Sequence, residues 1–194
     1  MRIGYGWDSH EFKSGIPLKL GGVTLEHDKG LAGHSDGDVL LHALTDALLG
    51  AIAAGDIGML FPPGDPQWKG ADSVIFLEEA MRRVEAAGYA VVNADTTLIL
   101  AAPKIAPHAR RIQRRVAELL KVDTTCIGVK AKTPEGMGTD NAAIAHAIVL
   151  LQRCEDDEQL GVLSAAEELP QAVVDETVEE VLESVPQEPL KRRR

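Results

Sequence analysis

The sequence predicts an α+β fold, an α/β sandwich in which a small mixed sheet carries helices packed on one face. Strand-like and helix-like segments alternate over residues 1–152. The chain of 194 residues is long enough for one domain with a real core and too short for two ordinary ones. Its 45% of hydrophobic and 26% of charged residues are typical of a soluble globular protein.

Four segments have the pattern of strands. Residues 2–10 and 18–27 predict short strands, and the pair Gly21-Gly22 predicts a bend or turn within the second. Residues 89–100 predict a long strand, and residues 126–136 predict a strand that runs into a loop.

Four other segments have the pattern of helices, at residues 35–55, 73–87, 106–121 and 139–151. Ser35 or Asp36 can cap the start of the first helix, and Gly55 can end it. The stretch "FPPGDPQWKGADS" at 61–73 is too rich in proline and glycine for regular structure and predicts a loop.

The charge of the chain is concentrated at its C-terminal end. The formal net charge is −10, and residues 155–194 account for −8 of it, which leaves −2 for residues 1–154. The acidity therefore says little about a substrate. We expect residues 1–152 to form the functional domain and residues 153–194 to form an acidic extension that is largely disordered.

Composition also excludes several classes of protein. No basic stripe suggests a nucleic-acid surface, and no apolar run reaches the roughly 20 residues of a membrane helix. The N-terminus "MRIGYGWDSH" lacks the pattern of an export signal, so we expect a cytoplasmic protein.

A dense group of histidines and aspartates points to a metal site. Asp8 and His10 lie two residues apart in a predicted strand, so both side chains project from the same face. His42 lies in the first predicted helix, with Asp38 and Asp46 four residues to either side. Three ligands with an open fourth position are typical of catalytic zinc sites, and a neighbouring carboxylate can orient the imidazole. A single "DxH" pair is a weak signal, and a lone helical histidine is more often a packed residue.

Two further segments have the composition of phosphate-binding sites. His34 and Ser35 lie at the predicted start of a helix, where free backbone N–H groups attract anions; plain capping by Ser35 explains them equally well. The segment "KAKTPEG" at 130–136 combines lysines, a threonine hydroxyl and Glu135, which suits Mg²⁺ bound together with a diphosphate. Without its context, this segment is more often an ordinary charged turn.

Five motifs in order make a family resemblance specific. The segments are "RIGYGWDSH", "AGHSDGDVLLHALTDALLGA", "GDIGMLFPPGDPQWKGADS", "NADTTLILAAPKIAPH" and "VKAKTPEGMG". Together they resemble the 2-C-methyl-D-erythritol 2,4-cyclodiphosphate synthase family over residues 1 to about 151.

The resemblance implies a metal-dependent cyclisation in the non-mevalonate route to isoprenoid precursors. In this reaction, 4-diphosphocytidyl-2-C-methyl-D-erythritol 2-phosphate closes to 2-C-methyl-D-erythritol 2,4-cyclodiphosphate and releases CMP. The enzyme class is a phosphorus–oxygen lyase. The resemblance also implies a homotrimer whose active sites lie between subunits.

The resemblance implies a role for each residue that matches a family position. Asp8, His10 and His42 would bind one divalent ion per subunit, zinc or else Mn²⁺ or Mg²⁺. Glu135 would hold Mg²⁺ or Mn²⁺ on the substrate diphosphate, while His34 and Thr133 would stabilise the transition state.

The same resemblance implies a substrate-binding set that covers the phosphates, the methylerythritol and the cytidine. Its members are Asp8, Ser9, His10, His34, Ser35, Asp56, Ile57, Gly58, Phe61, Pro62, Pro63, Gly64, Asp65, Leu100, Ala101, Ala102, Pro103, Lys104, Ile105, Ala106, Lys132, Thr133, Pro134 and Glu135.

The sequence departs from the family pattern after Glu135. Many members carry "GFxGRGEG" there, with an arginine that faces a trimer channel able to hold isoprenoid diphosphates. This chain reads "GMGTDNAAIAHA" and has no arginine, which puts such a channel site in doubt.

Two other functions fit part of the pattern. A zinc-dependent hydrolase of a phosphorylated small molecule would use the same ligands with an activated water. The nucleotide-type segments "TLILAAPKIAP" and "KAKTPE" favour the cyclising enzyme over this alternative. A non-catalytic trimer with structural zinc would usually show four protein ligands rather than three.

Overall fold

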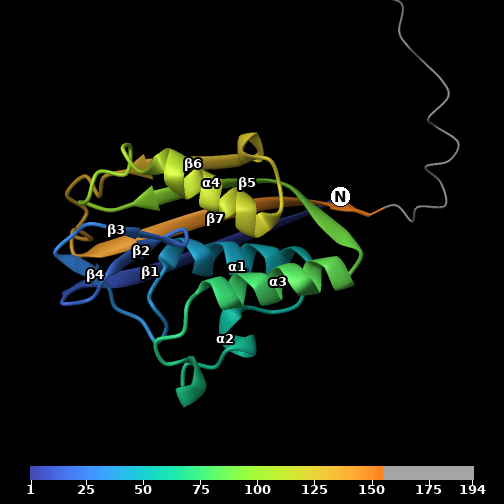
Figure 1. Cartoon of the computed structure of the whole chain (residues 1–194), viewed down its shortest axis with the longest axis horizontal. Coiled ribbons are helices and arrows are strands. Elements are labelled where there is room, and N and C mark those ends of the chain that lie inside the picture. The colour runs from blue at the N-terminus through green and yellow to red at the C-terminus, as the bar shows by residue number, and fades with distance from the viewer. Residues whose placement is uncertain (155–194) are drawn as a thin grey trace, which may run out of the picture. The chain divides into compact units, whose positions relative to one another are not determined.

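The computed structural model describes residues 1–154 of the chain (Figure 1). The strands are β1 (Arg2–Ser14), β2 (Leu18–Leu20), β3 (Val23–Leu25), β4 (Lys29–Leu31), β5 (Tyr89–Ile99), β6 (Ile127–Lys132) and β7 (Ala142–Arg153). The helices are α1 (Val39–Ala51), α2 (Ile57–Leu60), α3 (Val74–Ala86) and α4 (Ala109–Leu120), with short 3-10 turns at Pro66–Trp68 and Thr124–Cys126. The predicted acidic extension lies outside the described residues, apart from its first two positions.

One five-stranded sheet in the order β4-β1-β7-β5-β6 organises the fold. β5 and β6 pair in parallel and the other neighbours are antiparallel, while β2 and β3 form a separate hairpin. The three longer helices cover one face of this sheet, as Figure 1 shows. The predicted mixed α+β architecture is therefore confirmed, and the β2–β3 hairpin turns at Gly21-Gly22 as expected.

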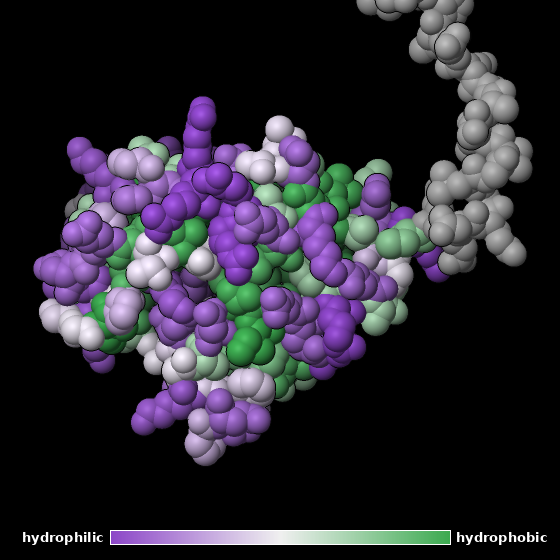
Figure 2. Space-filling view, viewed as in Figure 1, coloured by the Kyte–Doolittle hydropathy of each residue, from purple (hydrophilic) through white to green (hydrophobic). Residues whose placement is uncertain are grey.

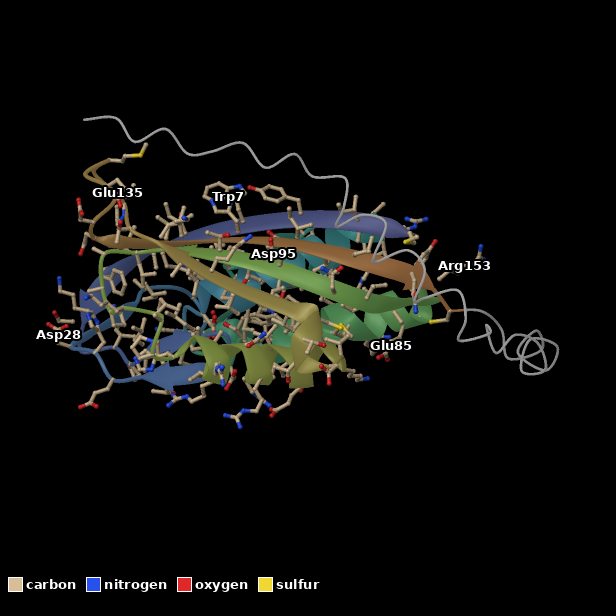
Figure 3. The ribbon with its side chains drawn as sticks, turned by 90° about the horizontal axis from the view of Figure 1, so that it is seen from above. Trp7, Asp28, Glu85, Asp95, Glu135 and Arg153 are labelled. Atoms are coloured by element: carbon tan, nitrogen blue, oxygen red, sulfur yellow. The ribbon has the colours of Figure 1, made fainter. Side chains whose placement is uncertain are left out.

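On the opposite face of the sheet, several large apolar side chains are exposed to solvent in the single chain. Ile3, Tyr5 and Trp7 of β1 are 71%, 57% and 54% exposed, and Ile148 of the adjacent β7 is 45% exposed. Figure 3 shows Trp7 on the side of the sheet away from the helices. By contrast, hydrophilic side chains cover much of the face that Figure 2 displays. Within residues 1–154, no helix has both the length and the apolar character to cross a membrane.

The predicted final helix at 139–151 is wrong, because this segment is the central strand β7. Its residues alternate, with Ala143, Ala145, Ala147, Val149 and Leu151 buried and the residues between them more accessible. The alanines suggested a helix because alanine has the highest helix propensity. Pairing with both β1 and β5 satisfies the backbone on two sides and overrides that local preference.

The first predicted helix starts later than expected. Asp38, rather than Ser35 or Asp36, caps α1 and is fully buried. Its carboxylate accepts hydrogen bonds from the backbone N–H groups of Leu40 and Leu41, and also from those of Gly21 and Gly22 in the hairpin turn. Asp38 therefore joins the helix start to the β2–β3 hairpin. The helix ends at Ala51, before the predicted Gly55.

α1 lies unusually close to β1 because two glycines face it. A Cβ atom on Gly4 would lie 1.8 Å from the carbonyl oxygen of Ala47, and one on Gly6 would lie 2.1 Å from that of Ala43. Both neighbours are backbone atoms that cannot rotate away. The glycines therefore set the distance between the sheet and the helix that carries His42.

We expect Gly6→Ala to destabilise the fold by about 2 kcal/mol or more, because the added methyl group must push α1 away from the sheet. Urea denaturation of the two proteins measures the difference. Gly64→Ala is the matched control, since a Cβ there meets no atom within 4 Å. Equal losses of stability in both variants would contradict the proposed close contact.

Candidate metal centre and substrate pockets

β1 and α1 bring the three predicted metal ligands together. Asp8 and His10 project from the same face of β1, and His42 approaches them from α1 across the contact at Gly6. Asp8 Oδ2 lies 2.9 Å from His10 Nε2 and 2.9 Å from His42 Nδ1, and the two nitrogens are 3.0 Å apart. No other group of at least three metal-binding side chains occurs within residues 1–154.

The donor set fits a divalent ion. Zinc bonds of about 2.0–2.1 Å in a tetrahedral site place neighbouring ligand atoms roughly 3.3 Å apart. The three observed separations of 2.9–3.0 Å need to widen by only a few tenths of an ångström around such an ion. A divalent ion among the three side chains would accept an electron pair from each of them.

Asp8 is suited to an ionised ligand. Burial raises the pKa of its carboxyl, but hydrogen bonds and positive charge from His10 and His42 outweigh burial and hold the pKa well below its usual range. Asp8 is therefore a carboxylate at neutral pH.

The second nitrogen of His42 does not bind a carboxylate, so the hypothesis that Asp38 or Asp46 orients this ring is wrong. Asp38 caps α1, and Asp46 accepts the backbone N–H of Ile57 at 2.8 Å. Instead, His42 Nε2 lies 2.9 Å from the hydroxyl of Ser73 and 3.0 Å from that of Ser35. Ser73 was not predicted because it lies 31 positions further along the chain, at the start of another helix.

A pocket of about 530 Å³ opens beside the metal ligands. His10 and His42 line it together with His34 and Ser35. Its remaining wall is largely apolar and consists of Lys13, Ala32, Gly33, Ile57, Gly58, Phe61, Pro63, Trp68 and Phe76. The pocket thus combines two metal ligands, two side chains that can donate hydrogen bonds to a phosphate, and a wall suited to a hydrocarbon chain.

Three aromatic rings form part of this wall. Phe61 lies 4.5 Å from Phe76 and 5.0 Å from Trp68, between ring centroids, and Trp68 lies 5.8 Å from Phe76. The predicted site contained Phe61 but neither Trp68 nor Phe76. Trp68 lies in the predicted loop, and Phe76 has the spacing of an ordinary core residue of α3. No local pattern distinguished them from packing residues.

A second pocket of about 340 Å³ lies between the loop after β5 and the end of β6. It brings together most of two predicted segments, with Leu100, Ala101, Pro103, Lys104, Ile105 and Ala106 from the first and Lys132, Thr133 and Glu135 from the second. The hydroxyl of Thr133 donates to the carboxylate of Glu135. Figure 3 shows Glu135 at the end of the sheet opposite Arg153.

Some predicted residues line neither pocket. Asp56 caps α2 through the N–H of Met59, and Asp65 caps the short turn at Pro66–Trp68. The others are Asp8, Ser9, Pro62, Gly64, Ala102 and Pro134. The two pockets share no lining residue, so the predicted catalytic pair, His34 and Thr133, is divided between them within one chain.

A carboxylate groups with two histidines, and both histidines line a substrate-sized pocket. This arrangement defines a metal-dependent enzyme that acts on a small molecule. A family model described as the YgbB family matches residues 1–152. The 2-C-methyl-D-erythritol 2,4-cyclodiphosphate synthase of Koribacter versatilis is 64% identical over 153 residues, which cover 79% of this chain and 99% of that protein. The chloroplastic synthase of Arabidopsis thaliana is 46% identical over 78% of this chain and 67% of its own length.

Solved structures agree with the sequence comparison. A structure of 2C-methyl-D-erythritol-2,4-cyclodiphosphate synthase matches with a TM-score of 0.74 at 46% identity, over 78% of this chain and all of that one. A second structure, described as the bound form with CDP, matches equally well. The chain belongs to the 2-C-methyl-D-erythritol 2,4-cyclodiphosphate synthase family.

We expect His42→Ala to weaken zinc binding by more than the roughly 10- to 100-fold that the loss of an outer-shell partner costs, because a direct ligand is lost. Isothermal titration of the metal-free protein with zinc measures the change. His108→Ala is the control, since His108 lies outside the triad and its side chain makes no capping hydrogen bond to α4. Unchanged zinc affinity in His42→Ala would refute the metal site.

Proposed function

We propose that the chain is a phosphorus–oxygen lyase that converts 4-diphosphocytidyl-2-C-methyl-D-erythritol 2-phosphate into 2-C-methyl-D-erythritol 2,4-cyclodiphosphate and CMP. This reaction belongs to non-mevalonate isoprenoid precursor biosynthesis. The observation that carries the proposal is the triad of Asp8, His10 and His42, whose two histidines line the 530 Å³ pocket. The names of the relatives support the particular reaction.

The reaction requires that the protein position the two reacting phosphate groups, and it requires no protein nucleophile. An oxygen of the 2-phosphate attacks the β-phosphorus, and the bond from that phosphorus to the CMP oxygen breaks as CMP leaves with the electron pair. Both reacting groups are anionic, so the barrier comes largely from repulsion and from ring closure. Asp8, His10 and His42 would hold a divalent ion, zinc or else Mn²⁺ or Mg²⁺, which would supply charge neutralisation.

The residues of the first pocket have roles that follow from their chemistry. His34 and Ser35 offer donors to the phosphate next to the metal ligands, and His34 would stabilise the transition state. Ile57, Gly58 and Phe61 offer an apolar wall to the methylerythritol chain. The neighbouring predicted residues Ser9, Asp56, Pro62, Pro63, Gly64 and Asp65 belong to the same proposed binding region.

The second pocket would take the cytidine and the diphosphate. Leu100 to Ala106 supply a loop for the base and sugar, and Lys132 supplies a positive charge for phosphate. Thr133 would stabilise the transition state, and Glu135 would hold Mg²⁺ or Mn²⁺ on the diphosphate. A relative that matches over 78% of this chain is described as bound to CDP, which supports a cytidine nucleotide as ligand.

A homotrimer would complete the active site. Ile3, Tyr5, Trp7 and Ile148 form an apolar sheet face that would be costly to leave in water. A second copy of the chain is the occupant that we propose for it. Because His34 and Thr133 line separate pockets in one chain, a site that uses both can arise where the first pocket of one subunit meets the second pocket of its neighbour.

Residues 1–152 would be sufficient for this activity, with residues 153–194 as an appendage. The K. versatilis relative supports this division, because nearly its whole length aligns with 153 residues of this chain. A cytoplasmic location stays a prediction. The segment after Glu135 has no arginine, so we propose no isoprenoid-diphosphate site in the trimer channel.

A ³¹P NMR time course with the cytidyl diphosphate substrate, Zn²⁺ and Mg²⁺ tests the reaction. We expect CMP and a cyclic diphosphate to appear together, and we expect a chelator to abolish both signals, because the triad and Glu135 need their ions. CMP together with a linear bisphosphate would identify a hydrolase instead and would overturn the proposal.

A mixture of two inactive variants tests the shared site. Co-expressed His42→Ala and Thr133→Ala subunits should form mixed trimers with about a third of the wild-type activity, because one of the three interfaces in each mixed trimer joins an intact first pocket to an intact second pocket. Mixed trimers are separated by two affinity tags, and each variant alone is the control. No recovered activity in verified mixed trimers would show that each site lies within one subunit.

A further inference from the structure

We propose that Ser73 is a positioning residue of the metal centre. Together with Asp36, it fixes the proton of His42 on Nε2 and leaves Nδ1 free to bind the ion. The inference rests on the proposed metal site and deepens it, because it names the group that prepares one of the three ligands.

The geometry of Ser73 points to His42 rather than to its own helix. Its hydroxyl lies 2.9 Å from His42 Nε2, and the residue is fully buried. Ser73 occupies the N-cap position of α3, where a serine hydroxyl commonly accepts a backbone N–H, yet it makes no such bond. The hydroxyl is therefore available for the imidazole.

The direction of each hydrogen bond follows from the partner of Ser73. The carboxylate of Asp36 accepts from the Ser73 hydroxyl and also from the Ser73 backbone N–H at 3.2 Å. An ionised carboxylate can only accept, so the single hydroxyl proton of Ser73 points to Asp36. The oxygen of Ser73 then meets His42 Nε2 with a lone pair, and this nitrogen must carry the ring proton. Nδ1 is left with a free electron pair, 2.9 Å from Asp8 Oδ2.

Lys19 holds Asp36 in this arrangement. Its ammonium group lies 2.8 Å from the other carboxylate oxygen of Asp36 and 3.1 Å from Asp72. The ion pair fixes the position of the Asp36 carboxylate next to Ser73. A continuous series of contacts thus runs from Lys19 through Asp36 and Ser73 to His42.

Ser35 cannot replace Ser73 in this role, although its hydroxyl lies 3.0 Å from the same nitrogen. No carboxylate fixes the direction of the Ser35 proton, because its other partners are the Ser73 hydroxyl at 3.2 Å and the N–H of Gly37 at 3.3 Å. Ser35 also lines the first pocket, where its proton is available to a ligand.

The test begins with the metal-free wild-type protein. Nitrogen-15 NMR at a pH where His42 is neutral reports which ring nitrogen carries the proton. We expect the proton on Nε2, protected from exchange with water and close to the β protons of Ser73. A proton on Nδ1 would overturn the proposal without the need for any variant.

Ser73→Ala should then weaken zinc binding roughly 10- to 100-fold and populate both ring tautomers of His42, because the acceptor for the Nε2 proton is lost. Ser73→Thr keeps the hydroxyl and should restore the affinity. Thr45→Val is the matched control, since it removes a buried hydroxyl of α1 that bonds only to the carbonyl of Leu41. Titration with zinc and the NMR spectrum both report on the site independently of turnover.

The outcomes separate the inference from the proposed function. Wild-type zinc affinity and a fixed Nε2 proton in Ser73→Ala would show that Ser73 only fills space. Equal losses in Ser73→Ala and Thr45→Val would show a general loss of packing and would also overturn the role. A wild-type protein that binds no zinc would contradict the metal site itself.

Discussion

The contact between α1 and β1 is the constraint on which the metal site depends. Gly4 and Gly6 leave no space between the strand and the helix backbone, and a Cβ atom at either position would overlap a carbonyl oxygen. Asp8 and His10 follow on the same strand, while His42 precedes Ala43 of the helix. The separation of the ligand atoms is therefore set by backbone packing rather than by long flexible side chains.

Buried polar groups fix the position of α1 and the orientation of the His42 ring. Asp38 is fully buried and accepts four backbone N–H groups, which joins the start of α1 to the Gly21-Gly22 turn. One helical turn further on, His42 meets Ser73 through its second nitrogen. Because an unpaired buried polar group is costly, each of these groups has one favourable arrangement. In the proposed arrangement, the orientation of His42 is set without the ion.

In the proposed trimer, the exposed sheet face would bring the two pockets of neighbouring subunits together. In one chain, the first pocket contains two metal ligands and an apolar wall. The second pocket contains the basic residues Lys104 and Lys132 and the acidic residue Glu135. The proposed catalytic pair, His34 and Thr133, is divided between these two pockets within one chain. Association through Ile3, Tyr5 and Trp7 would bury apolar surface and would also complete the site, so that one interaction serves both stability and catalysis.

Features that depend on neighbours in the chain could be predicted from the sequence, whereas contacts between distant segments followed from the packing of the folded chain. The alternation of side chains along a strand predicted that Asp8 and His10 lie on one face. Helical periodicity predicted α1, α3 and α4 to within a few residues. The ordered motifs are specific enough to identify the family. The alanine-rich segment Ala142–Arg153, by contrast, became the central strand because two neighbouring strands satisfy its backbone. Ser73 reached His42 because packing brought distant segments together. A local pattern carries no information about such partners, since the residue types involved are common in any core or loop.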